Sequence, residues 1–366
     1  MRRPARPGVR LRELPALRLG PLRVTSRQLD LLPSPEAAEP RWEVLDERGR
    51  GTRVLALSVR SVLNTSATTG MGFWSINPYV GCEFGCTYCY ARDTHRYAME
   101  RSGVPAEPLP AWQAFEQRIL VKTGVAEVLA RTLDPARLGE HSLVIGTATD
   151  PYQPAERRFR LTRRILEVLL HHRGLAIGII TKSPLVTRDI DVLRRLAERH
   201  EVTVNVSLAT LDSRLARRLE LRSPVPGARI RALARLTGAG IHAGLLVAPI
   251  LPGITDDRPG LDRLMGAAKE AGASYVVGSA LRLGPAARQR FLPVLTQEFP
   301  QLAERYARHY ARSEGVSAAY QRALSGRLHL LQQRHGFPVE EGRRRRQQLE
   351  GREHRASSSE DQPLLL

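Results

Sequence analysis

Between residues 70 and 285 the chain alternates short apolar runs with longer amphipathic stretches. The run 142–147 has the apolar centre Leu143, Val144 and Ile145, whereas the stretch 161–172 repeats its leucines and isoleucines at intervals of three and four residues. Short apolar runs that alternate with helices are typical of a parallel sheet buried on both faces. The predicted strands lie at 73–77, 142–147, 175–181, 202–208, 241–248 and 274–280.

The predicted helices lie at 161–172, 188–200, 213–239 and 257–271, and helical stretches are expected within 91–100 and 114–133. The segment 213–239 should break at Pro224 and Pro226, because proline ends or kinks a helix. Six strands with helices between them are two strands short of a closed eight-stranded barrel. The pattern therefore predicts an α/β protein with an open, partial barrel or a doubly wound sheet. Both architectures bind ligands at the C-terminal ends of their strands.

The segments outside this alternating region have a different composition. Residues 1–50 are rich in proline, arginine and glutamate without a sustained period, which predicts a disordered or irregular leader. A strand-like run at 53–59 precedes the predicted core, placed at 60–285. Only helical patterns follow, which predicts a C-terminal helical extension at 286–338. The charged and then serine-rich stretch 340–366 is expected to be a disordered tail.

The formal net charge of +19 favours a polyanionic partner such as nucleic acid. The composition offers a second explanation, because only three of the 56 basic residues are lysines. A bias toward arginine, with abundant alanine, leucine, glycine and proline, is what a GC-rich coding sequence produces. The charge therefore suits either nucleic-acid binding or a solvated surface.

Three further features predict the cellular location of the protein. No run of 18 apolar residues occurs, so neither a membrane-spanning helix nor a membrane partner is expected. The arginine-rich start lacks the continuous apolar segment of a secretory signal. The chain has three cysteines within eight residues, and an odd, clustered number argues against disulfides and for a reducing compartment. We therefore expect a cytoplasmic protein.

All three cysteines lie in one loop after the first predicted strand. Cys82, Cys86 and Cys89 have the spacing C-x3-C-x2-C. Three soft thiolates suit zinc or an iron–sulfur cluster, and they are one ligand short of a tetrahedral shell, so one metal position stays open. The alternative is a zinc knuckle completed by His95. Zinc sites of that kind usually have a second pair of ligands, and the chain has no further cysteine.

The cysteine spacing, with Tyr88 directly before the third cysteine, resembles the radical S-adenosylmethionine (SAM) superfamily. Further segments at consecutive strand ends are similar to the spore photoproduct lyase-like branch, and closer still to its uncharacterised bacterial relatives, over about residues 60–310. These segments are 147–153, 180–183, 205–207 and 247–250. The resemblance implies a partial (β/α)6 barrel and a radical SAM enzyme.

By the same resemblance, Cys82, Cys86 and Cys89 bind three irons of a 4Fe-4S cluster, and SAM binds the fourth iron. The reduced cluster passes one electron to SAM, which gives methionine and a 5′-deoxyadenosyl radical that abstracts hydrogen from a substrate. A flavodoxin- or ferredoxin-type electron donor is the partner that this chemistry implies.

The resemblance also gives candidate cofactor-binding residues. They are Thr149, Asp150, Lys182, Asn205, Ser207 and Ala248. Thr149 and Asp150 are expected at the amino group of SAM, where a carboxylate offsets positive charge. Lys182 and Ser207 are expected at the methionine carboxylate or the ribose, with Asn205 in the same strand as Ser207. The backbone at Ala248 is expected to flank the adenine.

Each candidate also has an ordinary structural explanation. Asp150 and Pro151 form a common turn sequence, and Ser207 suits the interior of a strand. Tyr88 and Tyr90, beside the third cysteine, are the candidate catalytic residues, because a tyrosine can relay a radical. Aromatic packing around the cysteine loop is the alternative for both.

One feature departs from the well-known spore photoproduct lyases. Those enzymes carry a further cysteine near the end of the second strand, which returns a hydrogen atom to the substrate radical. Here Thr147 and its neighbours occupy that region. A hydroxyl O–H bond is too strong for this role, so repair of the spore thymine lesion by that route is not expected. The substrate is left unassigned, with nucleic acid as one candidate.

Two other functions stay open from the sequence. The first is a nucleic-acid-binding or repair-related protein that uses its cluster structurally, with arginines after the second strand meeting phosphates. These arginines are Arg157, Arg158, Arg160, Arg163 and Arg164, and they also suit the solvated start of a helix. The second is a maturase acting on a protein side chain, although those families often carry an additional cysteine-rich cluster domain.

Overall fold

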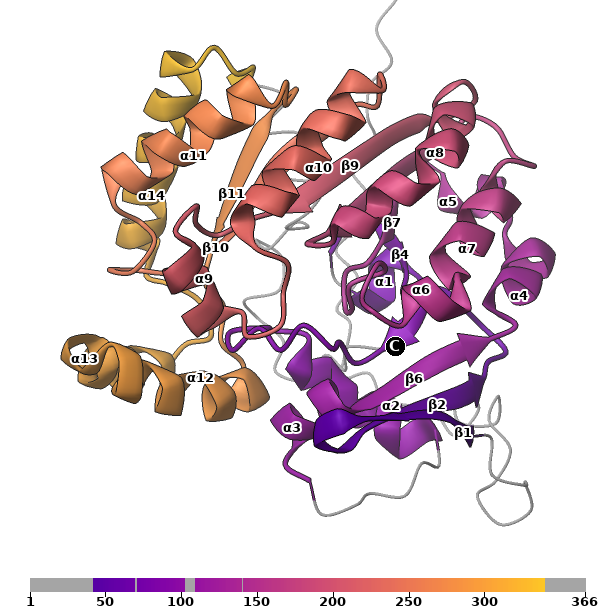
Figure 1. Ribbon diagram of the computed structural model, residues 1–366, viewed down its shortest axis with the longest axis horizontal. Coiled ribbons are helices and arrows are strands. Elements are labelled where there is room, and N and C mark those ends of the chain that lie inside the picture. Colours follow the sequence, from indigo (N-terminus) through magenta and orange to yellow (C-terminus); the bar gives the residue numbers. More distant parts are fainter. Residues whose placement is uncertain (1–41, 70, 103–108, 140, 340–366) are drawn as a thin grey trace, which may run out of the picture. The chain divides into compact units, whose positions relative to one another are not determined.

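The computed structural model describes residues 42–69, 71–102, 109–139 and 141–339. Its main sheet holds six parallel strands that neighbour one another in chain order (Figure 1). They are β4 (Trp74–Ile76), β7 (Leu143–Ile145), β8 (Ala176–Thr181), β9 (Glu201–Ser207), β10 (Ala243–Ile250) and β11 (Val276–Ala280). The short strand β3 (Leu63–Asn64) pairs antiparallel with β4 at one edge. The edge strands β3 and β11 are not paired with each other in the described sheet, so it is open. The six predicted strands are confirmed.

Helices connect the parallel strands, as the apolar spacing predicts, and several of them lie along one face of the sheet (Figure 1). They are α6 (Glu156–Phe159), α7 (Leu161–Leu169), the 3-10 helix η3 (Pro184–Asp189), α8 (Ile190–Ala197), α9 (Ser213–Leu219), α10 (Pro226–Gly238) and α11 (Arg258–Glu270). In α7 the buried residues Leu161, Ile165 and Leu169 recur every four positions and form one apolar face. The expected break in 213–239 is confirmed, because α10 begins at Pro226.

A second sheet has the strand order β1 (Trp42–Arg48), β2 (Thr52–Ser58), β6 (Arg118–Thr123), β5 (Tyr79–Val80). One prediction is wrong here, because the end of the expected leader forms β1. The helical stretches expected within 114–133 are confirmed at 114–117 and 125–132, but β6 lies between them and was not predicted. The cause is long-range pairing, since β6 runs parallel to β2 along its whole length. Val121 packs into the main core while Leu120 packs with Leu55 on the opposite face. Residues 1–41 of the leader lie outside the described residues.

The remaining helices precede β7 or follow β11. They are α1 (Ser66–Thr69), α2 (Arg92–Ser102), α3 (Ala111–Gln117), α4 (Val125–Thr132), α5 (Pro135–Leu138), α12 (Pro285–Glu298), α13 (Pro300–Tyr310) and α14 (Ala318–Arg334). Phe291 and Tyr306, from α12 and α13, pack in one apolar cluster with Cys82 and Cys86, so these helices cover the cysteine loop. The domain boundary at 286 stays a prediction, and the tail 340–366 lies outside the described residues. Among the described helices, none has both the length and the apolarity to cross a bilayer.

One lysine of the second sheet lies in an apolar environment. Lys122, in β6, is 6% exposed, and no described residue offers its amine a hydrogen-bond acceptor or a carboxylate. Its register partner Leu57 belongs to a buried cluster with Val80 and Leu120. Burial lowers the pKa of Lys122 from 10.5 to about 8. The ammonium form is therefore disfavoured in the folded protein.

We expect Lys122→Met to stabilise the protein at pH 7 by roughly 2–3 kcal/mol, because methionine fills the space without a buried amine. Between pH 8 and pH 10.5 the folded protein binds fewer protons at Lys122 than the unfolded chain, so wild-type stability rises across this window. The gain from the substitution should therefore shrink toward pH 10. Urea unfolding of both proteins at the two pH values measures it. The exposed Lys269 gives the control Lys269→Met, which should not stabilise. A gain of equal size at both pH values would show that burial does not lower the pKa of Lys122.

Candidate functional site

The three cysteines lie in a tight loop between β5 and α2. Gly81, directly before Cys82, has a φ of +81°, a left-handed conformation that favours glycine. A Cβ atom at this position would lie 2.8 Å from the backbone carbonyl oxygens of both Phe115 and Arg118. These are main-chain atoms and cannot rotate aside. The path of the chain into the first cysteine therefore requires glycine.

Hydrogen bonds from two distant segments hold this loop. Thr149, after β7, donates from its hydroxyl to the Gly81 carbonyl at 2.6 Å, and the Gln153 side chain donates to the same carbonyl at 3.1 Å. Leu219, the last residue of α9, provides the carbonyl that accepts from the Thr87 N–H at 2.9 Å. The loop's backbone groups thus have partners within the protein itself.

The cysteine side chains share one apolar environment. Cys82 and Cys86 are 7% and 6% exposed, and Cys89 is partly buried beside them. Burial raises the pKa of all three thiols, that of Cys86 to about 12. The Asp150 carboxylate and the two other cysteines raise the pKa of Cys82 further. The free thiols are therefore protonated at neutral pH, and a metal that binds them must displace their protons.

The donor set suits an iron–sulfur cluster better than a single zinc ion. Among the described residues, no three His, Cys, Asp or Glu side chains converge as the ligands of one ion must. His95, the alternative fourth zinc ligand, is buried with Nε2 3.1 Å from the Arg118 carbonyl and its ring edge-on to Phe115. A cubane cluster keeps its cysteines further apart than one ion does, and soft thiolates are its usual ligands. The described residues thus form no zinc knuckle.

Buried positive charge lies next to the cysteine loop. Arg92 is 0% exposed, and its Nη2 atom donates to the Cys86 carbonyl and to Glu116, each at 2.6 Å. Glu116 also pairs with Arg222 at 2.6 Å and with Arg290 at 3.3 Å. Three guanidinium groups therefore share one carboxylate. The surplus positive charge suits a bound group that becomes more negative on reduction.

Three of the predicted cofactor-binding residues form a chain of contacts at neighbouring strand ends. The Lys182 ammonium donates to the Ser207 hydroxyl at 2.9 Å, and that hydroxyl donates to the Ala248 carbonyl at 3.2 Å. The ammonium also lies 5.7 Å from the centre of the Tyr88 ring. The structure thus brings β8, β9 and β10 together beside the cysteine loop. That these three residues bind a cofactor stays a prediction.

Thr149 and Asp150, the predicted ligands of the SAM amino group, use their polar atoms within the protein. The Thr149 hydroxyl holds the Gly81 carbonyl. Asp150 accepts from the Thr181 hydroxyl and from the Lys182 backbone N–H, each at 2.7 Å. Asp150 therefore ties the end of β7 to the end of β8. Cofactor contact by either residue stays a prediction.

Asn205 and the two candidate catalytic tyrosines lie in three different environments. Asn205 is buried and accepts from the Tyr275 hydroxyl at 2.8 Å. Tyr88 is buried among the cysteines, whereas Tyr90 is 46% exposed and donates to the Thr147 carbonyl at 2.5 Å. Only Tyr90 of this pair reaches the surface near the loop. The roles expected for all three stay predictions.

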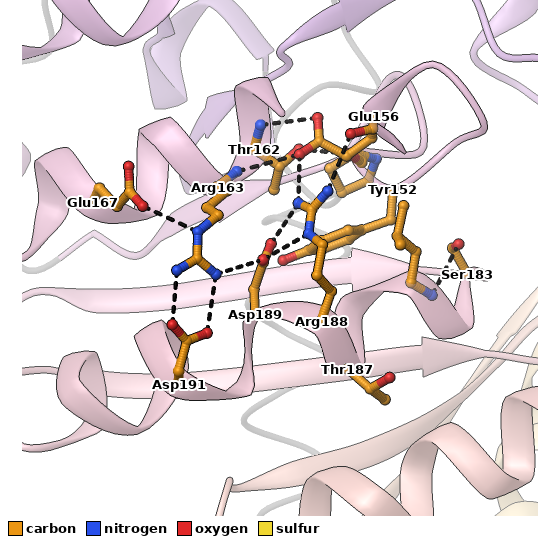
Figure 2. A network of polar contacts seen from close by, with 12 residues as sticks. Tyr152, Glu156, Thr162, Arg163, Glu167, Ser183, Thr187, Arg188, Asp189 and Asp191 are labelled. Carbon is orange, nitrogen blue, oxygen red and sulfur yellow. Dashed lines mark hydrogen bonds and ion pairs between the residues drawn. The ribbon is translucent and has the colours of Figure 1, made fainter. Parts of the chain in front are cut away.

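A network of ion pairs stabilises the segment after β7 (Figure 2). Glu156 and Asp189 are both 0% exposed, and Arg188 pairs with them at 2.9 and 2.8 Å. Arg163 joins Asp189 and Asp191 at 3.0 and 2.7 Å, so it is not free to meet phosphates. The exposed arginines of this segment are Arg157, Arg158, Arg160 and Arg164.

One functional candidate was missed from the sequence. Glu220 is 3% exposed, and its carboxylate accepts from the Tyr88 hydroxyl and from Arg229, with the Lys182 ammonium 3.3 Å away. Burial opposes ionisation, but Lys182 and Arg229 outweigh it and lower the pKa of Glu220 to about 2. A signal was present, since Glu220 is the sole acidic residue in the range 213–255.

Comparison with known proteins agrees with this geometry. The family model of the radical SAM superfamily matches residues 76–264. An uncharacterised protein of Mycobacterium tuberculosis is 34% identical over 255 residues, which cover 70% of this chain and 72% of that protein. An uncharacterised protein of Methanocaldococcus jannaschii is 25% identical over 203 residues, covering 56% of this chain and 70% of that protein.

A solved structure of spore photoproduct lyase complexed with dinucleoside spore photoproduct is similar in fold. It matches with a TM-score of 0.55 and 16% identity over 78% of this chain and 80% of that chain. At this level of identity the likeness concerns the fold alone.

We expect Gly81→Ala to prevent the cysteine loop from forming, because its Cβ would meet two backbone carbonyls at 2.8 Å. Gly240→Ala is the matched control, since Gly240 has a φ of +78° but nothing within 4 Å of the added Cβ. Both variants carry the same left-handed backbone strain of about 1 kcal/mol. After anaerobic reconstitution, iron analysis should find wild-type iron in the control and little in Gly81→Ala. Equal iron in the two variants would show that the cysteine loop does not require glycine at position 81.

Proposed function

The chain belongs to the radical SAM superfamily, and we propose that it is an enzyme that holds a 4Fe-4S cluster on Cys82, Cys86 and Cys89 and cleaves SAM reductively. The proposal rests mainly on three thiols that share one apolar loop. Three thiolates leave one iron of a cubane cluster free for a small ligand.

When bound, the reduced cluster and SAM supply a 5′-deoxyadenosyl radical that abstracts a hydrogen atom from the substrate. The protein binds, orients and shields these groups. Phe291 and Tyr306 pack with the cysteine loop, so α12 and α13 keep water from its apolar side. Arg92 places a positive charge beside the Cys86 carbonyl, which favours the more negative, reduced state.

The residues proposed to bind SAM lie at the strand ends beside this loop. The Lys182 ammonium suits the methionine carboxylate, and the Ser207 hydroxyl suits the same group or the ribose. The Ala248 backbone is proposed to flank the adenine, with Asn205 in the neighbouring strand. Asp150, whose carboxylate is close enough to raise the pKa of Cys82, is proposed to face the amino group together with Thr149. A flavodoxin- or ferredoxin-type protein in the cytoplasm is the proposed electron donor.

We propose that the reaction with the substrate does not use a cysteine as hydrogen-atom donor. All three cysteines of the sequence are assigned to the cluster. Tyr88 and Tyr90 are the proposed radical relays, and the exposed position of Tyr90 suits contact with a substrate. Repair of the spore thymine lesion through a cysteine donor is therefore not proposed.

A second candidate function is favoured by the positive charge of the chain. The net charge of +19 and the exposed arginines after β7 suit a nucleic-acid-binding protein with a structural cluster. The two candidates differ in one product, because a structural cluster does not convert SAM to 5′-deoxyadenosine.

We expect reconstituted wild-type protein to release 5′-deoxyadenosine when it is given dithionite and SAM without oxygen. Cys86→Ala should lose both the brown absorbance and this product, because the cluster loses one of its three ligands. Chromatography of the nucleosides and the visible spectrum measure the two effects. Ser313→Ala, which removes an exposed hydroxyl that donates to the Gly315 carbonyl and keeps all three thiols, is the control and should retain both. A wild type with an intact cluster and no product would favour the structural alternative, and one that binds zinc but no iron would exclude the proposed function.

Ser223 allows a finer test. Its hydroxyl lies 3.4 Å from the Cys86 sulfur and can donate to it once the thiol has lost its proton. Hydrogen bonds to cluster sulfurs stabilise the reduced state. Ser223→Ala should therefore shift the midpoint potential of the cluster to a more negative value in a redox titration followed by electron paramagnetic resonance. Ser183→Ala, which removes a hydroxyl that accepts from the Leu185 N–H, should leave the potential unchanged. The same potential in all three proteins would show that Ser223 does not act on the cluster.

A further inference from the structure

Glu220 lies where four segments of the chain meet. It directly follows α9, and its backbone forms an isolated bridge with Cys86 in the cysteine loop. Its side chain contacts the Tyr88 hydroxyl, the Lys182 ammonium after β8 and the Arg229 guanidinium in α10. The carboxylate therefore joins the metal-binding loop to the strand end that is proposed to bind SAM.

Arg229 fixes Glu220 in this position. The guanidinium is 0% exposed and has partners on all three nitrogens: the Pro224 carbonyl at 2.9 Å, the Ser207 carbonyl at 3.1 Å and the Glu220 carboxylate. A planar group bound at three points has little freedom to move. The same guanidinium also fixes the backbone of Ser207, the residue whose hydroxyl accepts from Lys182.

Lys182 differs from Arg229 because its ammonium has a hydrogen-bond donor without a partner among the described residues. Its side chain is 15% exposed, and the described residues provide its ammonium with two partners, Ser207 at 2.9 Å and Glu220 at 3.3 Å. An ammonium group has three N–H donors, so one is available. The ammonium shares the Glu220 carboxylate with Arg229, and the Asp150 carboxylate, which accepts from the Lys182 backbone N–H, also interacts with it electrostatically. The remaining N–H of the Lys182 ammonium can therefore donate to one further anionic partner.

We propose that Glu220 is a positioning residue that holds the Lys182 ammonium in place to receive the carboxylate of SAM. The proposal rests on the SAM-binding function proposed above, and it adds a residue that does not touch the ligand itself. A free lysine has a flexible four-carbon chain, and ordering it during binding would weaken affinity. The ion pair with Glu220 orders the chain beforehand, while Arg229 prevents Glu220 from following the ammonium.

The test measures dissociation constants of SAM and of decarboxylated SAM, which lacks the carboxylate, on reconstituted protein. Glu220→Gln keeps the size of the side chain and removes its charge, and we expect about tenfold weaker SAM binding. The affinity for decarboxylated SAM should be unchanged. Glu220→Asp keeps the pair with Arg229 but withdraws from Lys182, and it should show the same pattern if the first variant does not fold. Iron content and thermal unfolding verify that each variant is intact.

A double-mutant cycle gives a second, independent readout. Lys182→Met should weaken SAM binding, and adding Glu220→Gln to it should cause no further loss, because Glu220 acts through Lys182. Equal weakening of both ligands, additive losses, or unchanged or tighter SAM binding in Glu220→Gln would overturn the proposal. Wild-type protein that binds no SAM at all would instead exclude the proposed function, so the two failures can be told apart.

Discussion

Three cysteine thiols can lie together in an apolar loop only if the rest of the protein holds the loop's backbone. Here the Gly81 carbonyl takes hydrogen bonds from Thr149 and Gln153, and Leu219 accepts from Thr87. These partners come from the connections after β7 and after β9, which only a parallel sheet brings to the same edge. The loop in turn receives its cover from α12 and α13. The remaining parts of the fold can therefore be understood as supports for one short segment.

A second feature is that some buried acids pair with more than one cation. Glu116 contacts three arginines, and Glu220 contacts Arg229 and Lys182. Burying a carboxylate without such partners would be strongly unfavourable. Arg229 is fully buried, so some of the arginines stabilise the core and others contribute charge to the surface. The basic composition is thus a weaker argument for a polyanionic substrate than the count of charges suggests.

Local signals predicted most of this arrangement, and long-range ones were missed. The six parallel strands are short apolar runs whose character is visible in five to eight residues, and the three cysteines are adjacent in sequence. Strand β6 was not predicted, because its place beside β2 depends on residues 65 positions away. Glu220 was missed for the same reason, since its partners Tyr88, Lys182 and Arg229 come from three other segments.

We propose that three cysteines leave one iron of a cluster open to SAM. The most direct measurement is the electron paramagnetic resonance spectrum of the reduced, reconstituted wild-type protein, recorded with and without SAM. Coordination of SAM to the open iron would change the electronic structure of the cluster, so we predict a clear change in the g values when SAM is added. Identical spectra in the presence of saturating SAM would contradict it.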